Sequence, residues 1–170
     1  MFFRIKKIKG KEYAYMVENQ WKTKGSRQKV KDYIGRVYRF NLVNNTDFLK
    51  YFQVENVQNY IENNEKNKII KDLIEWELFK YSISSQEFSI DLSNIKIQKN
   101  NKNVVFLINN GFMCGFTLRN LLEFKPEGDE QNDGYKLARA FVEAGIKVPE
   151  EIFVGIFEKL CKSLGSSVVE

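Results

Sequence analysis

The N-terminal stretch of the chain reads FFRIKKIKGKEYAYMVENQWKTKGSRQKVKDYIGRVYRF over residues 2–40. Two short segments that contain glycine, Lys9-Gly10-Lys11 and Lys24-Gly25-Ser26, interrupt it and are typical of turns. The three runs that remain cover Phe2 to Ile8, Glu12 to Trp21 and Gln28 to Phe40. This spacing predicts a three-stranded antiparallel meander over residues 1–40.

The middle run alternates in the manner of a β-strand. Tyr13, Tyr15 and Val17 fall on one face, and Ala14 and Met16 fall on the other. Side chains of a strand point to its two faces in turn, so this pattern predicts a ribbon with both faces partly covered. In the third run, Gly35 marks either a bulge or the end of the strand.

Helices and further strands are expected after residue 40. Asn45 or Thr46 is the expected N-cap of a first helix, and Thr117 that of a later one. Periodicity predicts helices at Val54–Ile61, Lys66–Ile83, Thr117–Phe124 and Asn132–Ala144, and another from Pro149 to Gly165. Strands are predicted at Glu87–Leu92, Ile95–Gln98, Asn103–Ile108 and Phe112–Phe116, with a hairpin turn at Asn109-Asn110-Gly111.

These elements define an α+β fold with an N-terminal meander, central helices, a second antiparallel β region and a C-terminal helical hairpin. The 170 residues suit one domain, and 43% of them are apolar, which is too many for a disordered chain. We expect a single domain over residues 1–170. Its sub-regions are a basic ribbon at 1–40, helices at 45–83, a β-meander at 87–116 and helices at 117–164.

The sequence also indicates where the protein resides. No run of 18 or more apolar residues is present, and the charges in MFFRIKKIKG interrupt the apolar segment that a signal peptide needs. Cys114 and Cys161 both have apolar neighbours, which favours reduced thiols in the core. We expect a cytoplasmic protein without a membrane partner.

The chain has no histidine, and this restricts the chemistry open to it. Histidine is the commonest general base, the usual partner of a Ser or Cys nucleophile and the commonest zinc ligand. Carboxylates remain as candidate magnesium ligands: Asp91, Glu127, Asp129, Glu130 and Asp133. Acids at the start of a helix more often stabilise its dipole, so we expect a non-catalytic protein without a metal or cofactor and keep a metal-dependent nuclease as an alternative.

Charge is distributed unevenly along the chain. Residues 1–40 contain twelve basic and three acidic side chains, a net charge of +9, whereas the rest of the chain sums to −4. Such asymmetry favours an anionic partner, and nucleic acid is the commonest polyanion in the cytosol. A solvated basic face that maintains solubility is the alternative interpretation.

Aromatic residues accompany the cations of this segment, and we expect Trp21, at the edge of a turn, to be exposed. Cations can neutralise phosphates, and exposed rings can stack on unpaired bases. We therefore predict nucleic-acid binding, to RNA or DNA, through these residues: Lys6, Lys7, Lys9, Lys11, Trp21, Lys22, Lys24, Arg27, Lys29 and Lys31. Most of the remaining aromatics are expected to form the hydrophobic face of the sheet.

The run IKKIKGKEYAYMVENQWKTKGSRQKVKDYIGRV, residues 5–37, resembles the N-terminal segment of transposases of the IS4/IS1634 type. The shared order is a basic strand, an aromatic strand that ends in Val-Glu, a turn rich in Gly, Lys and Arg, and a closing Ile-Gly. The resemblance covers about a fifth of the chain and implies contact with nucleic acid. It carries over no catalytic residue, because this chain is too short for the ribonuclease-H-like domain of those enzymes.

An assembly or adaptor role is the alternative function. In that hypothesis the C-terminal helical hairpin at residues 132–164 docks a protein partner. A sizeable apolar strip left exposed on these helices would favour it.

Overall fold

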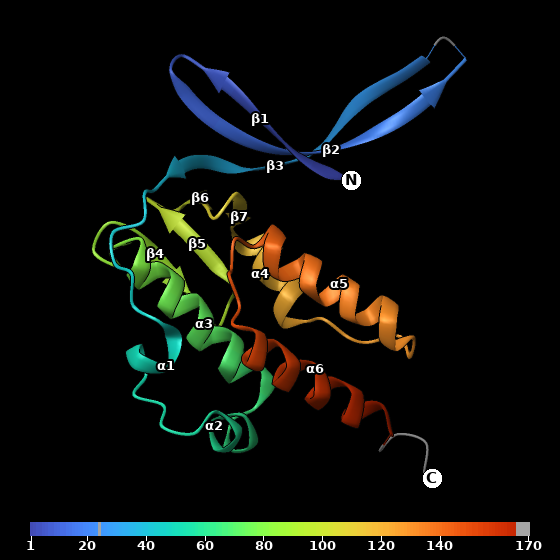
Figure 1. Ribbon diagram of the computed structural model, residues 1–170. Helices are drawn as coiled ribbons and strands as arrows, with labels where there is room; N and C mark the ends of the chain where they lie inside the picture. The colour runs from blue at the N-terminus through green and yellow to red at the C-terminus, as the bar shows by residue number, and fades with distance from the viewer. Residues whose placement is uncertain (24, 166–170) are drawn as a thin grey trace.

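A computed structural model describes residues 1–23 and 25–165. Figure 1 shows an N-terminal layer of strands above a body in which helices pack beneath further strands. The strands are β1 (Phe2–Ile8), β2 (Lys11–Lys22), β3 (Gly25–Arg39), β4 (Ser89–Asp91), β5 (Lys96–Lys99), β6 (Lys102–Ile108) and β7 (Gly111–Met113). The helices are α1 (Phe48–Tyr51), α2 (Val57–Asn63), α3 (Lys66–Lys80), α4 (Gly115–Leu122), α5 (Glu130–Glu143) and α6 (Glu150–Gly165). The predicted α+β fold is confirmed.

The N-terminal meander is also confirmed. β1 pairs antiparallel with β2 from Phe2 opposite Val17 to Ile8 opposite Lys11, and β2 pairs antiparallel with β3. A two-residue turn joins β1 to β2, with positive φ at Lys9 and Gly10. Turns of this kind match the right-handed twist of the strands that they connect, and their positive φ explains the glycine at this position.

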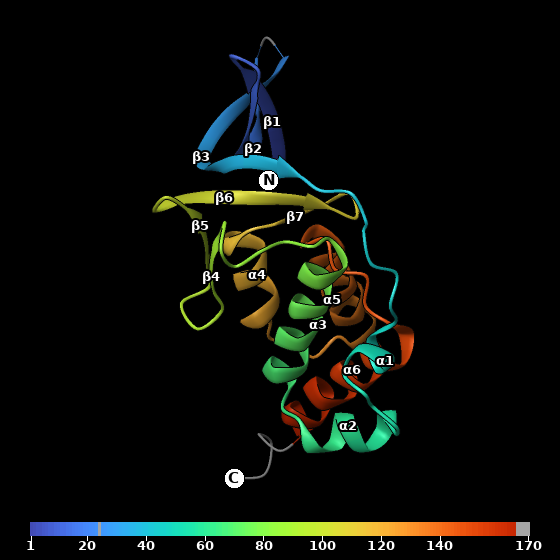
Figure 2. The ribbon, with the colours of Figure 1, turned by 90° about the vertical axis from the view of Figure 1, so that its left-hand side faces the viewer.

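Strand β3 joins the meander to the body by an unexpected parallel pairing. Its last residues, Arg36–Arg39, pair with Val104–Leu107 of β6, and Figure 2 shows β3 lying along β6. The register with β2 shifts where Ile34 and Lys31 each have no opposite residue, which increases the local twist. Gly35 stands at this junction, where a Cβ atom would come within 2.6 Å of the Asn103 carbonyl oxygen.

The curl of this sheet encloses a small core of its own. Ala14, Val37, Val105 and Cys114 are buried together, and Phe3, Ile5, Ile34, Leu107 and Phe112 pack around them. The rings of Phe3 in β1 and Phe112 in β7 stack with their centroids 4.6 Å apart. The first and last strands of the order β1-β2-β3-β6-β7 therefore meet across this core. The prediction that Cys114 is a core thiol is confirmed, whereas Cys161 is only half-buried.

The main core lies on the other face of β6, among the helices. Helix α3 contributes Ile69, Ile70, Leu73 and Ile74, all with no exposed surface, in agreement with its expected burial on most sides. Val104, Phe106 and Ile108 of β6 cover one side of this core, and residues of α4, α5 and α6 cover the others. Helices α5 and α6 run in opposite directions (Figure 1), which is the predicted C-terminal hairpin. No helix in the described residues is long and apolar enough to cross a membrane.

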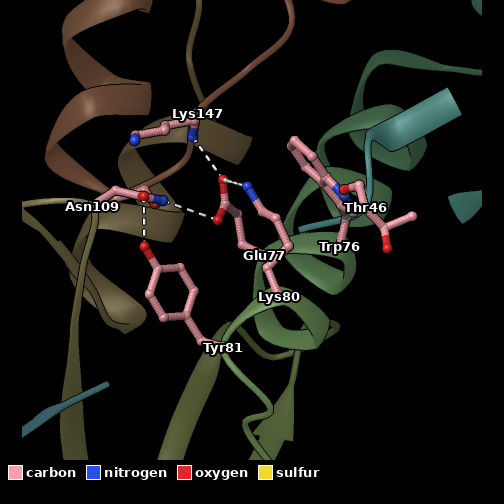
Figure 3. A network of polar contacts seen from close by, with 8 residues as sticks. Thr46, Trp76, Glu77, Lys80, Tyr81, Asn109 and Lys147 are labelled. Carbon is pink, nitrogen blue, oxygen red and sulfur yellow. Dashed lines mark hydrogen bonds and ion pairs between the residues drawn. The ribbon is translucent and has the colours of Figure 1, made fainter. Parts of the chain in front are cut away.

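A buried polar network ties three segments of the body together (Figure 3). The Glu77 side chain, which has no exposed surface, accepts from Nδ2 of Asn109 at 3.0 Å and from the Lys147 backbone N–H at 2.8 Å. Its other partner is the Lys80 ammonium at 3.1 Å. Helix α3, the β6–β7 turn and the α5–α6 connection thus share one buried carboxylate.

Several predicted boundaries need correction. Asp47 caps α1 through the Lys50 N–H, so neither Asn45 nor Thr46 is the N-cap. Cys114 is the N-cap residue of α4, and Thr117 is the third residue of the helix, where its hydroxyl accepts from the Cys114 N–H at 3.2 Å in a capping box. The return strand, predicted to end at Phe116, ends at Met113, because helix α4 already begins at Gly115.

Two of the predicted helices, at Val54–Ile61 and Lys66–Ile83, also have different limits. The helix expected at Val54–Ile61 begins at Val57, because the Asn56 side chain caps it through the Asn59 N–H. Helix α3 ends at Lys80 instead of Ile83, because Ser82 adopts a positive φ that stops it. The sequence also predicts that the last five residues, 166–170, are frayed, and these residues lie outside the described part of the chain.

Candidate nucleic-acid interface

The meander has two hairpins that point away from each other. We call residues 2–17 the proximal hairpin and residues 18–29 the distal hairpin; Figure 1 shows their turns on opposite sides of the crossing point. From Lys11 to Lys22, β2 makes eleven steps, which correspond to about 36 Å of extended chain. Only β3 pairs with the outer half of β2, since β1 pairs no further along it than Val17.

The predicted binding residues divide between these hairpins. Lys6, Lys7, Lys9 and Lys11 belong to the proximal hairpin, and Trp21, Lys22, Arg27 and Lys29 to the distal one. Lys31 lies between the two in β3, and Lys24 lies outside the described residues. The structure therefore arranges these cations along an elongated ribbon and does not bring them together at one place.

Ion pairs of the meander are made within the meander. Lys31 binds Glu18 at 2.9 Å, and Arg39 binds Glu12 at 2.6 Å. In the described residues, no ion pair joins residues 1–40 to the rest of the chain. The net positive charge of the ribbon is thus left uncompensated by direct contacts with the acidic remainder of the fold.

One face of the ribbon combines tyrosines with cations. Residues that lie directly opposite each other in neighbouring strands point to the same side of a sheet. The register places Lys6, Tyr13 and Arg36 in one row across the three strands, and Arg4, Tyr15 and Tyr33 in the next. We call these six residues the tyrosine face.

The three rings of the tyrosine face form a cluster. Tyr33, with 55% of its surface exposed, lies between the other two, at 5.4 Å from Tyr15 and 6.3 Å from Tyr13 between ring centroids. The Lys6 ammonium lies 4.8 Å from the centre of the Tyr15 ring, a favourable cation–π distance. Burial and the neighbouring phenols raise the pKa of Tyr33, so its hydroxyl stays neutral at physiological pH.

Acids of the meander lie on the opposite face. Glu12 is the cross-strand partner of Lys7, Asp32 that of Met16 and Glu18 that of Lys29. All three positions alternate with the tyrosines along the strands, so they point away from them. The tyrosine face is therefore cationic without an acid of the meander on the same side, whereas Lys7, Lys29 and Lys31 share their side with carboxylates.

The binding residues predicted from the sequence include Lys6 of the tyrosine face but not Arg4 or Arg36. The prediction that most aromatics form the hydrophobic face of the sheet is correct for Phe3 but not for Tyr13, Tyr15 and Tyr33, which lie on the tyrosine face. Alternation in β2 already separates its tyrosines from Ala14 and Met16. What the sequence does not contain is the register of β1 and β3, which decides which cations stand beside those rings.

The distal hairpin exposes the aromatic residue expected there. Trp21 has 84% of its surface exposed, and it occurs at an odd-numbered position of β2, like Tyr13 and Tyr15. Arg27 is the cross-strand partner of Gln20, and the backbone of Lys22 lies opposite Gly25. Two-stranded hairpins are marginally stable alone, and Figure 1 shows the described part of this one extending away from the body.

Three of the five acids considered as magnesium ligands accept hydrogen bonds from the local backbone, and Glu127 pairs with Lys136. Asp133 is buried and accepts from the N–H groups of Glu127 and Gly128, and Asp129 caps α5 through the Asn132 N–H. Asp91 accepts from the N–H groups of Ser93 and Asn94. Within the described residues, no group of three or more acidic or cysteine side chains is arranged to hold a metal ion.

Helices α5 and α6 expose few large apolar side chains. Tyr135 and Val142 on α5 and Val154 on α6 are exposed. The ion pair between Arg139 and Glu143 lies on the same stretch of α5. Tyr135 and Val154 are single exposed apolar residues of a kind that is ordinary on protein surfaces. Val142 instead lines a hollow of about 460 Å³ together with Phe2, Phe3 and Phe116, so the adaptor hypothesis keeps one candidate contact surface beside α5.

Comparisons with models of known families, with curated proteins and with solved structures find no match for this chain. The functional argument therefore depends on the residues and geometry described above.

Proposed function

We propose that this protein is a small, non-catalytic nucleic-acid-binding protein that contacts RNA or DNA phosphates through its N-terminal meander. The observation that carries the proposal is the separation of charge on the ribbon. Arg4, Lys6 and Arg36 lie on a face that holds none of the three acids of the meander. Polyanions are attracted to such a face because binding releases the counterions condensed along their phosphates.

The shape of the ribbon supports the same ligand class. A strip of about 36 Å has the length of about ten base pairs of duplex DNA, at 3.4 Å for each pair. Lys9 and Lys11 at one end and Arg27 at the other extend the cationic surface beyond the tyrosine face. The resemblance of residues 5–37 to transposase N-terminal segments points to the same class of ligand.

The test compares three full-length proteins in binding to labelled duplex DNA, single-stranded DNA and structured RNA. A meander variant carries Arg4→Gln, Lys6→Gln and Arg36→Gln. A body variant carries Lys50→Gln, Lys125→Gln and Lys147→Gln, three exposed lysines outside the meander, and so has the same net charge. We expect the meander variant to lose at least about ten-fold in affinity and the body variant to lose much less.

Equal losses in the two variants would show that only net charge matters and would contradict a localised interface. Absence of binding to all three ligands by the unmodified protein at low salt would overturn the proposed function. That result would favour the adaptor alternative, in which a protein partner docks on residues 132–164.

A further inference from the structure

The tyrosine face is hollowed beside its rings. Ile8, Tyr13, Tyr15 and Tyr33 line an open depression of about 430 Å³ on the outside of the proximal hairpin. The walls are mainly apolar, and the depression lies next to Lys6 through its contact with the Tyr15 ring. A planar, weakly polar group that carries or adjoins a negative charge fits this combination.

The three tyrosine rings lie on the face of the meander that is turned away from its small core. Tyr13 and Tyr15 project from the face opposite to Ala14, which belongs to the small core under the meander, and to Met16, which is also buried. The three tyrosines therefore add nothing to that core, although each offers a large apolar area. The three rings cover part of each other's surface, and a ligand that binds over them would cover more of it.

Whether such rings can contribute to binding depends on whether the nucleic acid is single-stranded or double-stranded. In a duplex the flat faces of the bases are covered by their neighbours in the stack, and only base edges are open in the grooves. Unpaired bases expose both faces, and an aromatic side chain can stack on them whatever their sequence. Exposed rings next to cations therefore favour single strands over duplexes.

The cations are placed to hold the backbone of such a strand. Lys6 and Arg36 lie on the two sides of Tyr13 in one row, and Arg4 lies beside Tyr15 in the next. Arg4 also donates to the Gln28 side chain of β3 across the sheet. A chain that runs along the ribbon would meet rings and cations in alternation.

We infer that the ligand of the meander is single-stranded nucleic acid, with unpaired bases stacked on Tyr33, Tyr15 and Tyr13 and phosphates held by Arg4, Lys6 and Arg36. This inference rests on the proposed function and narrows its ligand. Ribose and deoxyribose strands share the chemistry that the face recognises, so RNA and DNA are separate arms of the test.

The experiment measures fluorescence anisotropy of labelled oligothymidylate and oligouridylate, each about 20 nucleotides long, and of a duplex of about 20 base pairs, all at about 50 mM salt. The full-length protein is compared with Tyr33→Leu, which removes the ring and keeps an apolar side chain, and with Tyr33→Phe, which keeps the ring. Tyr135→Leu, at an exposed tyrosine on α5, is the matched control.

The expected result is tighter binding of the single strands than of the duplex. Tyr33→Leu should weaken single-strand binding by about 5- to 150-fold, the fold-change that corresponds to one stacked base, and should change duplex binding less than about two-fold. Tyr33→Phe and Tyr135→Leu should bind like the unmodified protein. Circular dichroism of each variant verifies that the fold is kept.

Two outcomes would overturn the inference in different ways. If duplex binds as tightly as single strands and Tyr33→Leu leaves both unchanged, the inference is wrong while the proposed function stands. If none of the three ligands binds, the proposed function fails and the inference fails with it.

Discussion

Phe3 and Phe112 come from the two edge strands of the curled sheet, and their rings stack with centroids 4.6 Å apart and planes 15° apart. This contact closes the small core that the meander shares with the body. Phe116 lies edge-on to the same Phe3 ring at 5.9 Å. The attachment of the ribbon therefore depends on one half-buried aromatic cluster in addition to the pairing of β3 with β6.

Replacing Phe3 by Ala should loosen the ribbon from the body. We expect a loss of about 1–3 kcal/mol in the free energy of unfolding, below the 3–5 kcal/mol typical of a fully buried Phe, because the ring is only partly buried. Urea denaturation measures the change. Phe2→Ala, at the neighbouring exposed residue on the other face, is the control. Equal losses in the two variants would contradict the role given to the Phe3–Phe112 stack.

Replacing Glu77 by Ala should destabilise the body strongly. The change leaves the Lys80 ammonium, the Asn109 amide and the Lys147 N–H without their buried acceptor. Removal of one partner from a buried ion pair costs about 3–5 kcal/mol, and thermal or urea unfolding should show a loss of this size. Glu75→Ala, at an exposed acid of the same helix, should cost less than about 0.5 kcal/mol. Similar effects at the two positions would show that the network contributes little.

Asp133 should make stability depend on pH in the acid range. N–H groups of Glu127 and Gly128 donate to its carboxylate and hold its pKa below the usual value. A carboxyl whose pKa is lower in the folded state stabilises the fold above its unfolded pKa, and this stabilisation is lost as the pH falls through the folded value. Asp133→Asn should thus be less stable than the unmodified protein at pH 7, and the difference should shrink at about pH 3.

Melting temperatures of both proteins at the two pH values measure this difference. Glu130→Gln, at an exposed acid in the first turn of α5, is the control and should show a small difference at either pH. A gap between Asp133→Asn and the unmodified protein that stays constant from pH 7 to about pH 3 would exclude the proposed linkage.

The two tryptophans should differ in accessibility to a quencher. Trp21 is 84% exposed on the distal hairpin, whereas Trp76 is 7% exposed and donates to the Thr46 carbonyl oxygen at 2.8 Å. Acrylamide should quench two populations of fluorescence in the unmodified protein, and Trp21→Phe should remove the accessible one. If the distal hairpin belongs to the interface, bound nucleic acid should also protect Trp21. Quenching that Trp21→Phe leaves unaltered would contradict the exposed position of this residue.

Much of the fold could be predicted because its signals are local. Gly10 identifies the first turn of the meander, and the apolar residues of Lys66–Lys80 recur at spacings that indicate a mostly buried helix. The N-caps were less predictable, because Asn45, Thr46 and Asp47 are all good capping residues and only the path of the chain decides among them. The pairing of β3 with β6 could not be predicted, since it joins residues more than sixty positions apart.

The candidate site, too, has features that could be predicted from local sequence and features that could not. Alternation along β2 separates Tyr15 from Met16, and this much is contained in the sequence. The neighbours of Tyr15 come from β1 and β3, and the register shift at Lys31 decides that Tyr33 lies opposite it. The predicted binding cations lie far apart for a related reason, because a single strand of twelve residues carries Lys11 and Lys22 at its two ends.

The salt dependence of binding tests the central claim most directly. The claim is that cations of the tyrosine face neutralise phosphates, and each neutralised phosphate contributes about 0.7 to 0.9 to the slope of log K against log salt concentration. For the unmodified protein we predict a steep fall in affinity with salt, and for the variant with Arg4→Gln, Lys6→Gln and Arg36→Gln a slope smaller by about two to three. A slope that is flat in the unmodified protein, or equally steep in both proteins, would contradict the account.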